Sequence, residues 1–347
     1  VGSEMCIRDR SDFSEIKWSM EMDALWYGSE DGAFFDFPTI SKNRTIKYPM
    51  LPDEIASKLN NSQSIRIQEK NNGEIRVLSA DIALMSSRKN NNDATAIFIN
   101  QMKPSRAGRY SSNIVYADAC EGMRTDEQAL YIRKLYEDYK CDYIVLDTNG
   151  LGLGVYDALA RDMVNPDTGE LYPALSCCNN AEMASRCTVI GAKKVIWSIK
   201  ASAQFNSDCA FMLREAFRSG RMRLLSTEYD AEKYLAEIRG YNSLSDSDKM
   251  SLQLPYIHTT LLVDELTKLL YEESGGKIKI TERAGMRKDR YSSLSYNYYV
   301  AMQIENKMSK RQNIGDGASD MFIIKAPNYR RKAVNGLYGR TKASWRF

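Results

Sequence analysis

The sequence predicts an α/β protein with a mixed β-sheet flanked by helices. Residues 75–117 hold three closely spaced apolar strands, the pattern of an antiparallel meander. From residue 125 onward, helical and strand patterns alternate, which favours helices on the faces of a mixed sheet. The 347 residues are 43% apolar and 27% charged, as in ordinary globular proteins, so the chain can bury a sizeable core.

The first three strands are predicted from apolar runs bounded by polar loops. Residues 75–83 are apolar on both sides and contain Asp81 near their end, and residues 86–92 form a polar loop. Strands over residues 94–99 and 113–117 follow after short connections. A meander is the simplest arrangement of strands connected in this way.

The second half begins with a helix signal. Thr125 with Gln128 three residues later is a capping-box pattern, and apolar residues then recur at helical spacing. A short apolar strand over residues 143–146 ends at Asp147 and precedes a glycine loop. Further helices are predicted over 155–163, 198–218, 231–238 and 291–308, and further strands over 171–175, 222–225 and 278–281.

Composition argues against several classes of function. A single histidine, His258, leaves little room for a histidine-rich zinc site or a Ser-His-Asp triad. Seven cysteines without CxxC spacing fit reduced thiols better than a disulfide framework. We find no apolar run of transmembrane length and no secretory signal, so we expect a protein that is neither membrane-bound nor secreted.

The ends of the chain differ from its middle. Residues 1–10 lack periodicity and are interpreted as a fragment end or a non-native leader, residues 11–55 resemble an incomplete domain, and residues 56–73 resemble a polar linker. Residues 74–310 form the predicted main domain. Residues 311–347 form a tail with no acidic residue after Met321, where Arg330, Arg331 and Lys332 stand among aromatic residues. That composition suits binding of a nucleic-acid strand or a solvated tail.

Three aspartates are the strongest candidates for chemistry. Asp81 and Asp147 each end an apolar strand, and Asp289 opens the last predicted helix. Each has an ordinary explanation, as a solvated strand end or as a helix N-cap. If the strands of Asp81 and Asp147 are neighbours, these two carboxylates would repel each other unless a cation neutralised them. Asp93 is a weaker fourth candidate, equally suited to a turn.

The chemistry that these residues suit is metal-assisted phosphodiester hydrolysis. Mg²⁺ and Mn²⁺ prefer hard oxygen ligands, and a two-metal site needs carboxylates rather than histidines. The loop of Gly150, Gly152 and Gly154 either cradles phosphate or lets a helix pack tightly on a strand. Lys193, Lys194 and Lys200 flank a predicted helix start, where they form either a solvated face or phosphate contacts.

The acidic motifs resemble those of a known family. The runs Ser79–Ala83 with Asn92–Ala96, Val145–Gly152 and Lys288–Leu294 are similar to the nuclease domain of the large terminase subunit of tailed bacteriophages. The resemblance covers roughly residues 70–308 and implies an RNase H-like fold. Glu15–Ile40 is similar to the end of the terminase ATPase domain. The chain contains no GxxxxGK[ST] motif, so no ATP hydrolysis is expected.

The resemblance implies an endonuclease that cuts double-stranded viral DNA during genome packaging. Asp81, Asp147 and Asp289 would bind two ions of Mg²⁺ or Mn²⁺, with Asp93 as a possible further ligand. Lys200 matches a basic position of the family and would contact DNA. Lys193, Lys194 and the tail residues Arg330, Arg331 and Lys332 are candidate DNA contacts on position and composition alone. The implied partners are the portal protein and the small terminase subunit, in the host cytoplasm.

Two alternatives remain open at this point. One is another RNase H-like nuclease, such as a junction resolvase or a ribonuclease H, with the same fold and a different substrate. The other is a non-catalytic module that binds DNA or a portal ring through the basic tail, the acids then serving as caps and turns.

Overall fold

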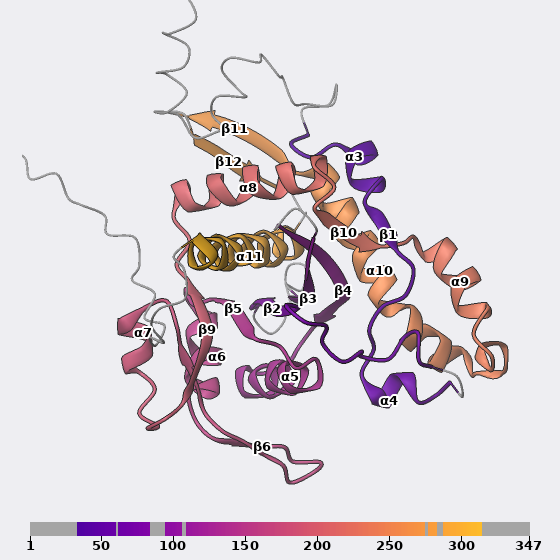
Figure 1. The fold of residues 1–347 in the computed structure, drawn as a ribbon, viewed down its shortest axis with the longest axis horizontal. Helices are drawn as coiled ribbons and strands as arrows, with labels where there is room; N and C mark the ends of the chain where they lie inside the picture. Colours follow the sequence, from indigo (N-terminus) through magenta and orange to yellow (C-terminus); the bar gives the residue numbers. More distant parts are fainter. Residues whose placement is uncertain are drawn as a thin grey trace, which may run out of the picture.

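A computed structural model describes residues 33–59, 62–83, 94–105, 109–274, 277–282 and 287–313. Its centre is an eight-stranded mixed sheet with the order β1-β10-β4-β3-β2-β5-β9-β8 (Figure 1). The strands are β1 (Arg44–Ile46), β2 (Ile75–Asp81), β3 (Thr95–Pro104), β4 (Tyr110–Cys120), β5 (Tyr143–Asp147), β8 (Leu175–Cys177), β9 (Lys193–Ile199) and β10 (Met222–Leu225).

Strand directions confirm the predicted fold class. β2, β3 and β4 form an antiparallel meander, while β5 runs parallel to β2, β9 to β5 and β8 to β9. On the other side, β10 runs parallel to β4, and β1 to β10. A meander followed by parallel strands, with helices in the connections, is the RNase H-like arrangement that the sequence motifs implied.

Helices cover both faces of the sheet. In Figure 1, α8 (Ala203–Arg218) and α11 (Asp289–Asn313) lie on one side of the central strands, and α5 (Thr125–Asp138) and α6 (Leu151–Leu159) on the other. The remaining helices are α3 (Phe37–Ser41), α4 (Asp53–Ala56), α7 (Ala181–Ser185), α9 (Glu228–Ala236), α10 (Asp246–Lys268) and the 3₁₀ turn Tyr241–Ser243. Two hairpins stand outside the sheet: β6 (Met163–Val164) with β7 (Leu171–Tyr172), and β11 (Leu270–Ser274) with β12 (Lys277–Thr281).

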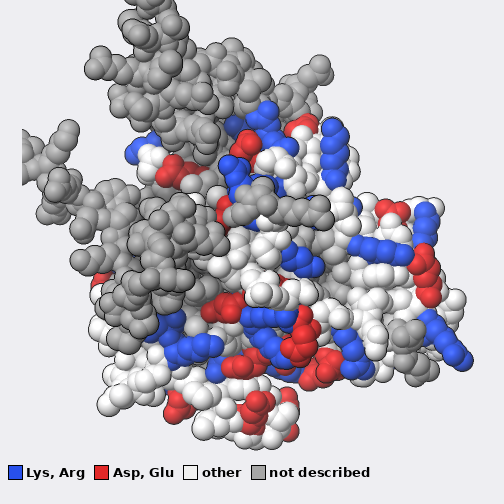
Figure 2. Space-filling model, viewed as in Figure 1, with Lys and Arg blue, Asp and Glu red and all other residues white. Residues whose placement is uncertain are grey.

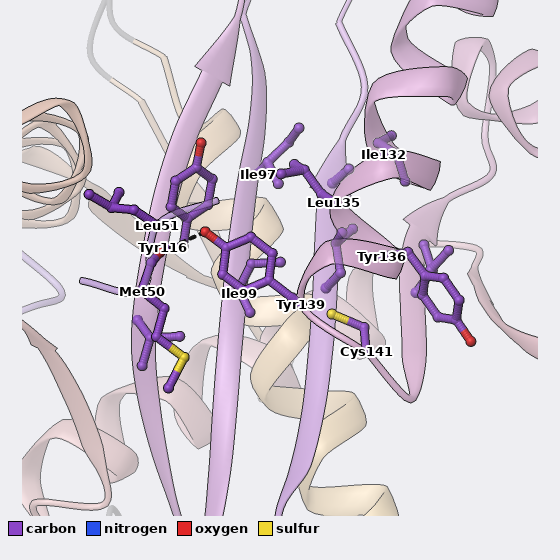
Figure 3. Close-up of a cluster of buried hydrophobic side chains, with 14 of the residues drawn as sticks. Met50, Leu51, Ile97, Ile99, Tyr116, Ile132, Leu135, Tyr136, Tyr139 and Cys141 are labelled. Carbon is purple, nitrogen blue, oxygen red and sulfur yellow. Dashed lines mark hydrogen bonds between the residues drawn. The ribbon is translucent and has the colours of Figure 1, made fainter. Parts of the chain in front are cut away.

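The alternation of side chains along β2 separates two parts of the core. Leu78 and Ala80 pack in one cluster with residues of α5 and α6, whereas Val77 packs in another with residues of α11. In the α5 cluster, the hydroxyl of the fully buried Tyr139 donates a 2.6 Å hydrogen bond to the Met50 carbonyl (Figure 3). Ser79 and Asp81 therefore belong to the face that α11 covers.

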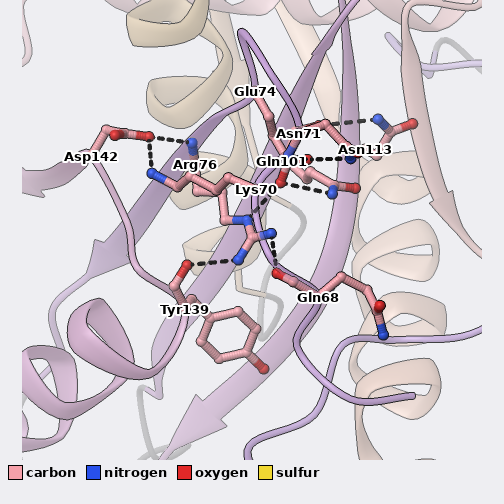
Figure 4. Close-up of polar contacts among 9 residues, drawn as sticks. All are labelled: Gln68, Lys70, Asn71, Glu74, Arg76, Gln101, Asn113, Tyr139 and Asp142. Carbon is pink, nitrogen blue, oxygen red and sulfur yellow. Dashed lines mark hydrogen bonds and ion pairs between the residues drawn. The ribbon is translucent and has the colours of Figure 1, made fainter. Parts of the chain in front are cut away.

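A fully buried ion pair anchors the first residues of β2. The Arg76 guanidinium lies 2.7 Å from Glu74 and donates to the backbone carbonyls of Tyr139 and Gln68 at 3.0 and 2.6 Å (Figure 4). Glu74 also accepts from Gln101 and Asn71 at 2.9 and 3.0 Å. Neither side chain of the pair is exposed, so these contacts replace the water that both charges have lost.

Described residues that precede the main domain pack on it. Phe34 and Phe35 are 2% exposed and lie in the core cluster formed with α8, α10 and α11. β1 pairs with β10 in the sheet, and Leu59 and Ile65, from the predicted linker at 56–73, are buried against the core. The division of the chain into separate segments stays a prediction. Residues 1–10 and the tail beyond 313 lie outside the described residues.

Several sequence-predicted elements were wrong in extent or type. Residues 193–199 form β9, so the helix predicted from Ser198 begins at Ala203, where the Ser202 side chain accepts from the Phe205 amide. Lys193 and Lys194 therefore lie on a strand, whereas Lys200 stands between that strand and the Ser202 cap of α8. At α5 the residue before the helix is Arg124, whose amide donates to Glu127 at 2.9 Å, so the predicted cap at Thr125 was one residue too late.

Other elements were missed or shifted. The 23-residue helix α10 and strand β11 were not predicted, and α6 begins at Leu151 within the glycine loop rather than at Val155. None of the helices that the structure describes is long and apolar enough to cross a membrane.

Candidate active site

Strand register places the first two candidate aspartates side by side. β2 and β5 are parallel neighbours, with Ala80 paired to Leu146. Asp81 and Asp147 are the next residue on each strand and the last residue of each. Both carboxylates therefore leave the sheet at the same edge, which the sequence analysis predicted only on the condition that the strands were neighbours.

The third aspartate comes from α11, which is fixed to β2 by buried polar contacts. The hydroxyls of Ser79 and Ser293 are 3.0 Å apart, and Asn297 donates to the Val77 carbonyl at 3.1 Å. Asp289 precedes Ser293 by about one helical turn. Asp81 follows Ser79 on the same face of the strand. Asp81 and Asp289 therefore both lie beyond the Ser79–Ser293 contact, at the same end of the interface between β2 and α11.

The acids influence one another electrostatically. Burial first, and then the negative charges of Asp289, Asp147 and Glu265, together raise the pKa of Asp81 to about 8. Burial also raises the pKa of Asp147, an effect opposed by hydrogen bonds from Asn149, whose amide lies 2.9 Å from the carboxylate. Uncompensated negative charge of this kind favours a bound cation.

The chemical type of these ligands suits a hard divalent cation, because three or more carboxylates, which offer oxygen atoms, lie toward one edge of the sheet. Among the residues that the structure describes, no three Asp, Glu, His or Cys side chains converge closely enough to hold an ion. Asp93, the possible further ligand, lies outside the described residues. The assignment of ligands therefore stays a prediction that rests on placement and charge.

A fourth carboxylate at this site, Glu265, was missed by the sequence analysis. It lies on α10, is 8% exposed, and its pKa is raised to about 7 by burial, with a smaller contribution from Asp289. One signal could have found it. Glu265 stands beside the apolar positions Leu262 and Leu266, which are fully buried, so it occupies the inward face of a helix.

The glycine loop packs the start of α6 against the end of β5. A Cβ atom at Gly152 would lie 1.7 Å from the Asp147 carbonyl oxygen, and one at Gly154 would lie 3.0 Å from the Thr125 methyl group. Gly150 has φ of 57°, in the region that favours glycine. Close helix–strand packing, one of the two interpretations of this loop, is therefore what the structure shows.

The candidate DNA-contacting lysines occupy two different edges of the sheet. We call the edge of the sheet at which β2 and β5 end, with Asp81 and Asp147, the acidic edge. Ile199 pairs with Asp147, so Lys200 directly follows the acidic edge, and its amine lies 3.4 Å from Glu182. Lys193 and Lys194 begin β9 at the opposite edge, about 20 Å away at the usual rise along a strand. The Lys193 amine contacts the Tyr136 hydroxyl at 3.2 Å.

The remaining basic candidates, Arg330, Arg331 and Lys332, lie outside the described residues. On the face seen in Figure 2, basic and acidic side chains of the described residues are interspersed. This distribution agrees with the nearly balanced net charge of +3.

Comparison with known proteins gives structural matches only. No protein-family model and no curated protein matches the sequence. Among solved structures, the magnesium-bound large terminase nuclease of thermophilic phage G20c is similar, with 13% identity, a TM-score of 0.41 and coverage of 78% of this chain and 98% of that one.

Two further matches come from other phages. The large terminase nuclease domain of Thermus phage P74-26 has 15% identity and a TM-score of 0.38, covering 76% of this chain and 93% of that one. The nuclease domain of the large terminase subunit of bacterial virus Sf6 has 13% identity and a TM-score of 0.38, covering 79% and 97%. These are nuclease domains of the family whose motifs the sequence resembles.

Proposed function

We propose that this protein is a metal-dependent endonuclease that cuts double-stranded viral DNA during genome packaging. One observation carries the proposal: Asp81 and Asp147 end neighbouring parallel strands in register, and α11 brings Asp289 to the same edge. Caps and turns do not require three acids from distant parts of the chain to share one charged cluster. A site for divalent cations does.

In this proposal Asp81, Asp147 and Asp289 hold two ions of Mg²⁺ or Mn²⁺. When bound, such ions stabilise the attacking and leaving oxygens of a phosphodiester. The chain itself supplies the placement of the ligands. β2 and β5 set the separation of Asp81 and Asp147, and the Ser292 hydroxyl donates to the Asp81 carboxylate.

The wider setting of this activity follows from the motif resemblance. The protein would act in the host cytoplasm with a portal protein and a small terminase subunit, and it would not hydrolyse ATP. Lys200 would contact the DNA backbone beside the acidic edge. Lys193, Lys194 and the tail residues would contact DNA held elsewhere on the molecule.

A plasmid-nicking assay with Mg²⁺, Mn²⁺ or EDTA tests the proposal, comparing wild type with Asp81→Asn and with Asp142→Asn. Asp142 is a matched control because it flanks the opposite end of β5, where it contacts Lys70 at 2.7 Å. We expect metal-dependent cutting by wild type and Asp142→Asn, and none by Asp81→Asn. Equal cutting by Asp81→Asn would refute the site.

A second outcome would favour the binding-module alternative. In that case wild type shifts DNA on a native gel in a salt-sensitive manner, without cutting at any metal concentration. Comparison of duplex DNA, four-way junctions and RNA–DNA hybrids as substrates distinguishes the proposed activity from that of a resolvase or a ribonuclease H.

A further inference from the structure

The helix that carries Asp289 begins without a capping side chain from its own preceding residue. Asp289 is the first residue of α11, and Lys288 before it has no acceptor group in its side chain. The first amides of a helix have no partner within the helix. An N-cap role for Asp289, the ordinary interpretation of this residue, would place it one position earlier than it stands.

A carboxylate from another helix fills this position. One Glu265 oxygen accepts from the backbone amide of Tyr291 at 2.7 Å, and the carboxylate also accepts from the Arg290 amide. Its other oxygen lies 3.8 Å from the Arg290 guanidinium. Glu265 is buried, so these contacts are shielded from water and define the place of the first turn.

The opposite side of the same turn is held by β2. Ser292 donates to Asp81, and Ser293 contacts Ser79 at 3.0 Å. The first turn of α11 is thus fixed from two directions, by α10 through Glu265 and by β2 through the two serines. Asp289 lies in that turn, so its position relative to Asp81 depends on both sets of contacts.

We propose that Glu265 is a positioning residue that caps α11 and thereby places Asp289 against Asp81. In its consequence for metal binding, this inference rests on the proposed nuclease function. Removal of the carboxylate frees the first turn from α10 and loosens the geometry of the acidic edge. Groups that orient metal ligands typically change metal affinity by about 10- to 100-fold when they are removed.

The test compares Glu265→Ala and Glu265→Gln with Glu305→Ala. Glu305 is a matched control because it is also a buried glutamate that accepts a backbone amide, from Tyr110 at 3.0 Å, and pairs with an arginine, Arg221. It lies on α11 at a distance from the first turn. Hydrogen–deuterium exchange over residues 287–296 without metal, Mn²⁺ titration calorimetry and the nicking assay are measured on each variant.

We expect exchange at the Tyr291 amide to rise at least about 10-fold in Glu265→Ala, with Mn²⁺ affinity falling by about 10-fold or more. Glu265→Gln retains an oxygen acceptor and should recover most of both properties. Glu305→Ala should change neither, although it loses thermal stability.

Unchanged exchange over residues 287–296 in Glu265→Ala would overturn the inference, as would an equal loss of Mn²⁺ affinity in Glu305→Ala. If wild type neither binds Mn²⁺ nor cuts DNA, the proposed function fails. The exchange measurement then still decides whether Glu265 positions the first turn of α11, so the two failures can be distinguished.

Discussion

Gly152 lies directly against the carbonyl oxygen of Asp147, where a Cβ atom would stand 1.7 Å from that oxygen. Because the obstacle is backbone, it cannot move aside as a flexible side chain would. We predict that Gly152→Ala forces α6 away from the end of β5, at a cost of about 1–3 kcal/mol of stability, as for other overpacked sites. DNA cleavage should be lost with it, since Asp147 would be displaced.

Gly154→Ala is the control for this prediction. It lies on the same helix, and its Cβ would meet only the Thr125 methyl group, at 3.0 Å. Alanine is favoured over glycine within helices by about 1 kcal/mol, which offsets this contact. Urea unfolding and the nicking assay should therefore show near-native behaviour, and wild-type cleavage by Gly152→Ala would contradict the close-packing argument.

The raised pKa of Asp81 predicts a pH dependence of stability without metal. The folded protein holds this proton up to about pH 8, whereas the unfolded chain releases it near the ordinary value of 3.8. Between these values the folded state binds more protons, so the contribution of Asp81 to stability falls as pH rises. Asp81→Asn removes this dependence.

Thermal unfolding in EDTA from pH 5 to pH 8 measures the effect. We expect the melting temperature of Asp81→Asn to rise relative to wild type across this range, because wild type must take up a proton at Asp81 in order to fold and the variant need not. Mg²⁺ or Mn²⁺ at pH 8 should stabilise wild type more than the variant. Parallel curves for the two proteins in EDTA would show that Asp81 titrates normally.

The part of the site on β2 and β5 was predictable because each strand is a largely apolar run that ends in an acid. β9 was not predicted, because Lys193, Lys194 and Ser198 interrupt its apolar character, and its last two residues were assigned to the following helix. α10 was missed because it contains Pro255 and begins with a polar stretch, so Glu265 was missed with it.

Long-range contacts could not be predicted from the sequence for a different reason. The approach of Ser293 to Ser79 joins residues that are 214 positions apart, and nothing in the local pattern of either segment specifies the other. The acids could be nominated from the sequence, but the contact that brings Asp289 to the strand edge required the fold.

The two ends of β9 predict different roles for its lysines. Lys200 follows the strand at the edge that carries Asp147, whereas Lys193 begins it at the other edge. We predict that Lys200→Ala weakens DNA binding and slows cleavage several-fold, by loss of one phosphate contact. Lys193→Ala should leave cleavage unchanged.

Fluorescence anisotropy with a labelled duplex at several salt concentrations checks this prediction. The slope of log affinity against log salt concentration is negative, and its magnitude should fall by about one in Lys200→Ala, as expected for one lost phosphate contact. An equal change in both variants would mean that DNA does not bind preferentially at the acidic edge.

The buried pair of Arg76 and Glu74 stabilises the end of β2 opposite Asp81. Arg76→Ala would leave the Glu74 carboxylate buried without its cation, which costs about 3–5 kcal/mol in comparable pairs. Replacing both residues, as Arg76→Met with Glu74→Gln, removes both charges and should restore much of that loss. Lys70→Ala breaks only the half-exposed contact to Asp142 and should cost at most about 1 kcal/mol. Urea unfolding of the three variants measures these changes in the free energy of unfolding. A similar loss of stability in Arg76→Ala and Lys70→Ala would show that the buried network in Figure 4 does not anchor the strand.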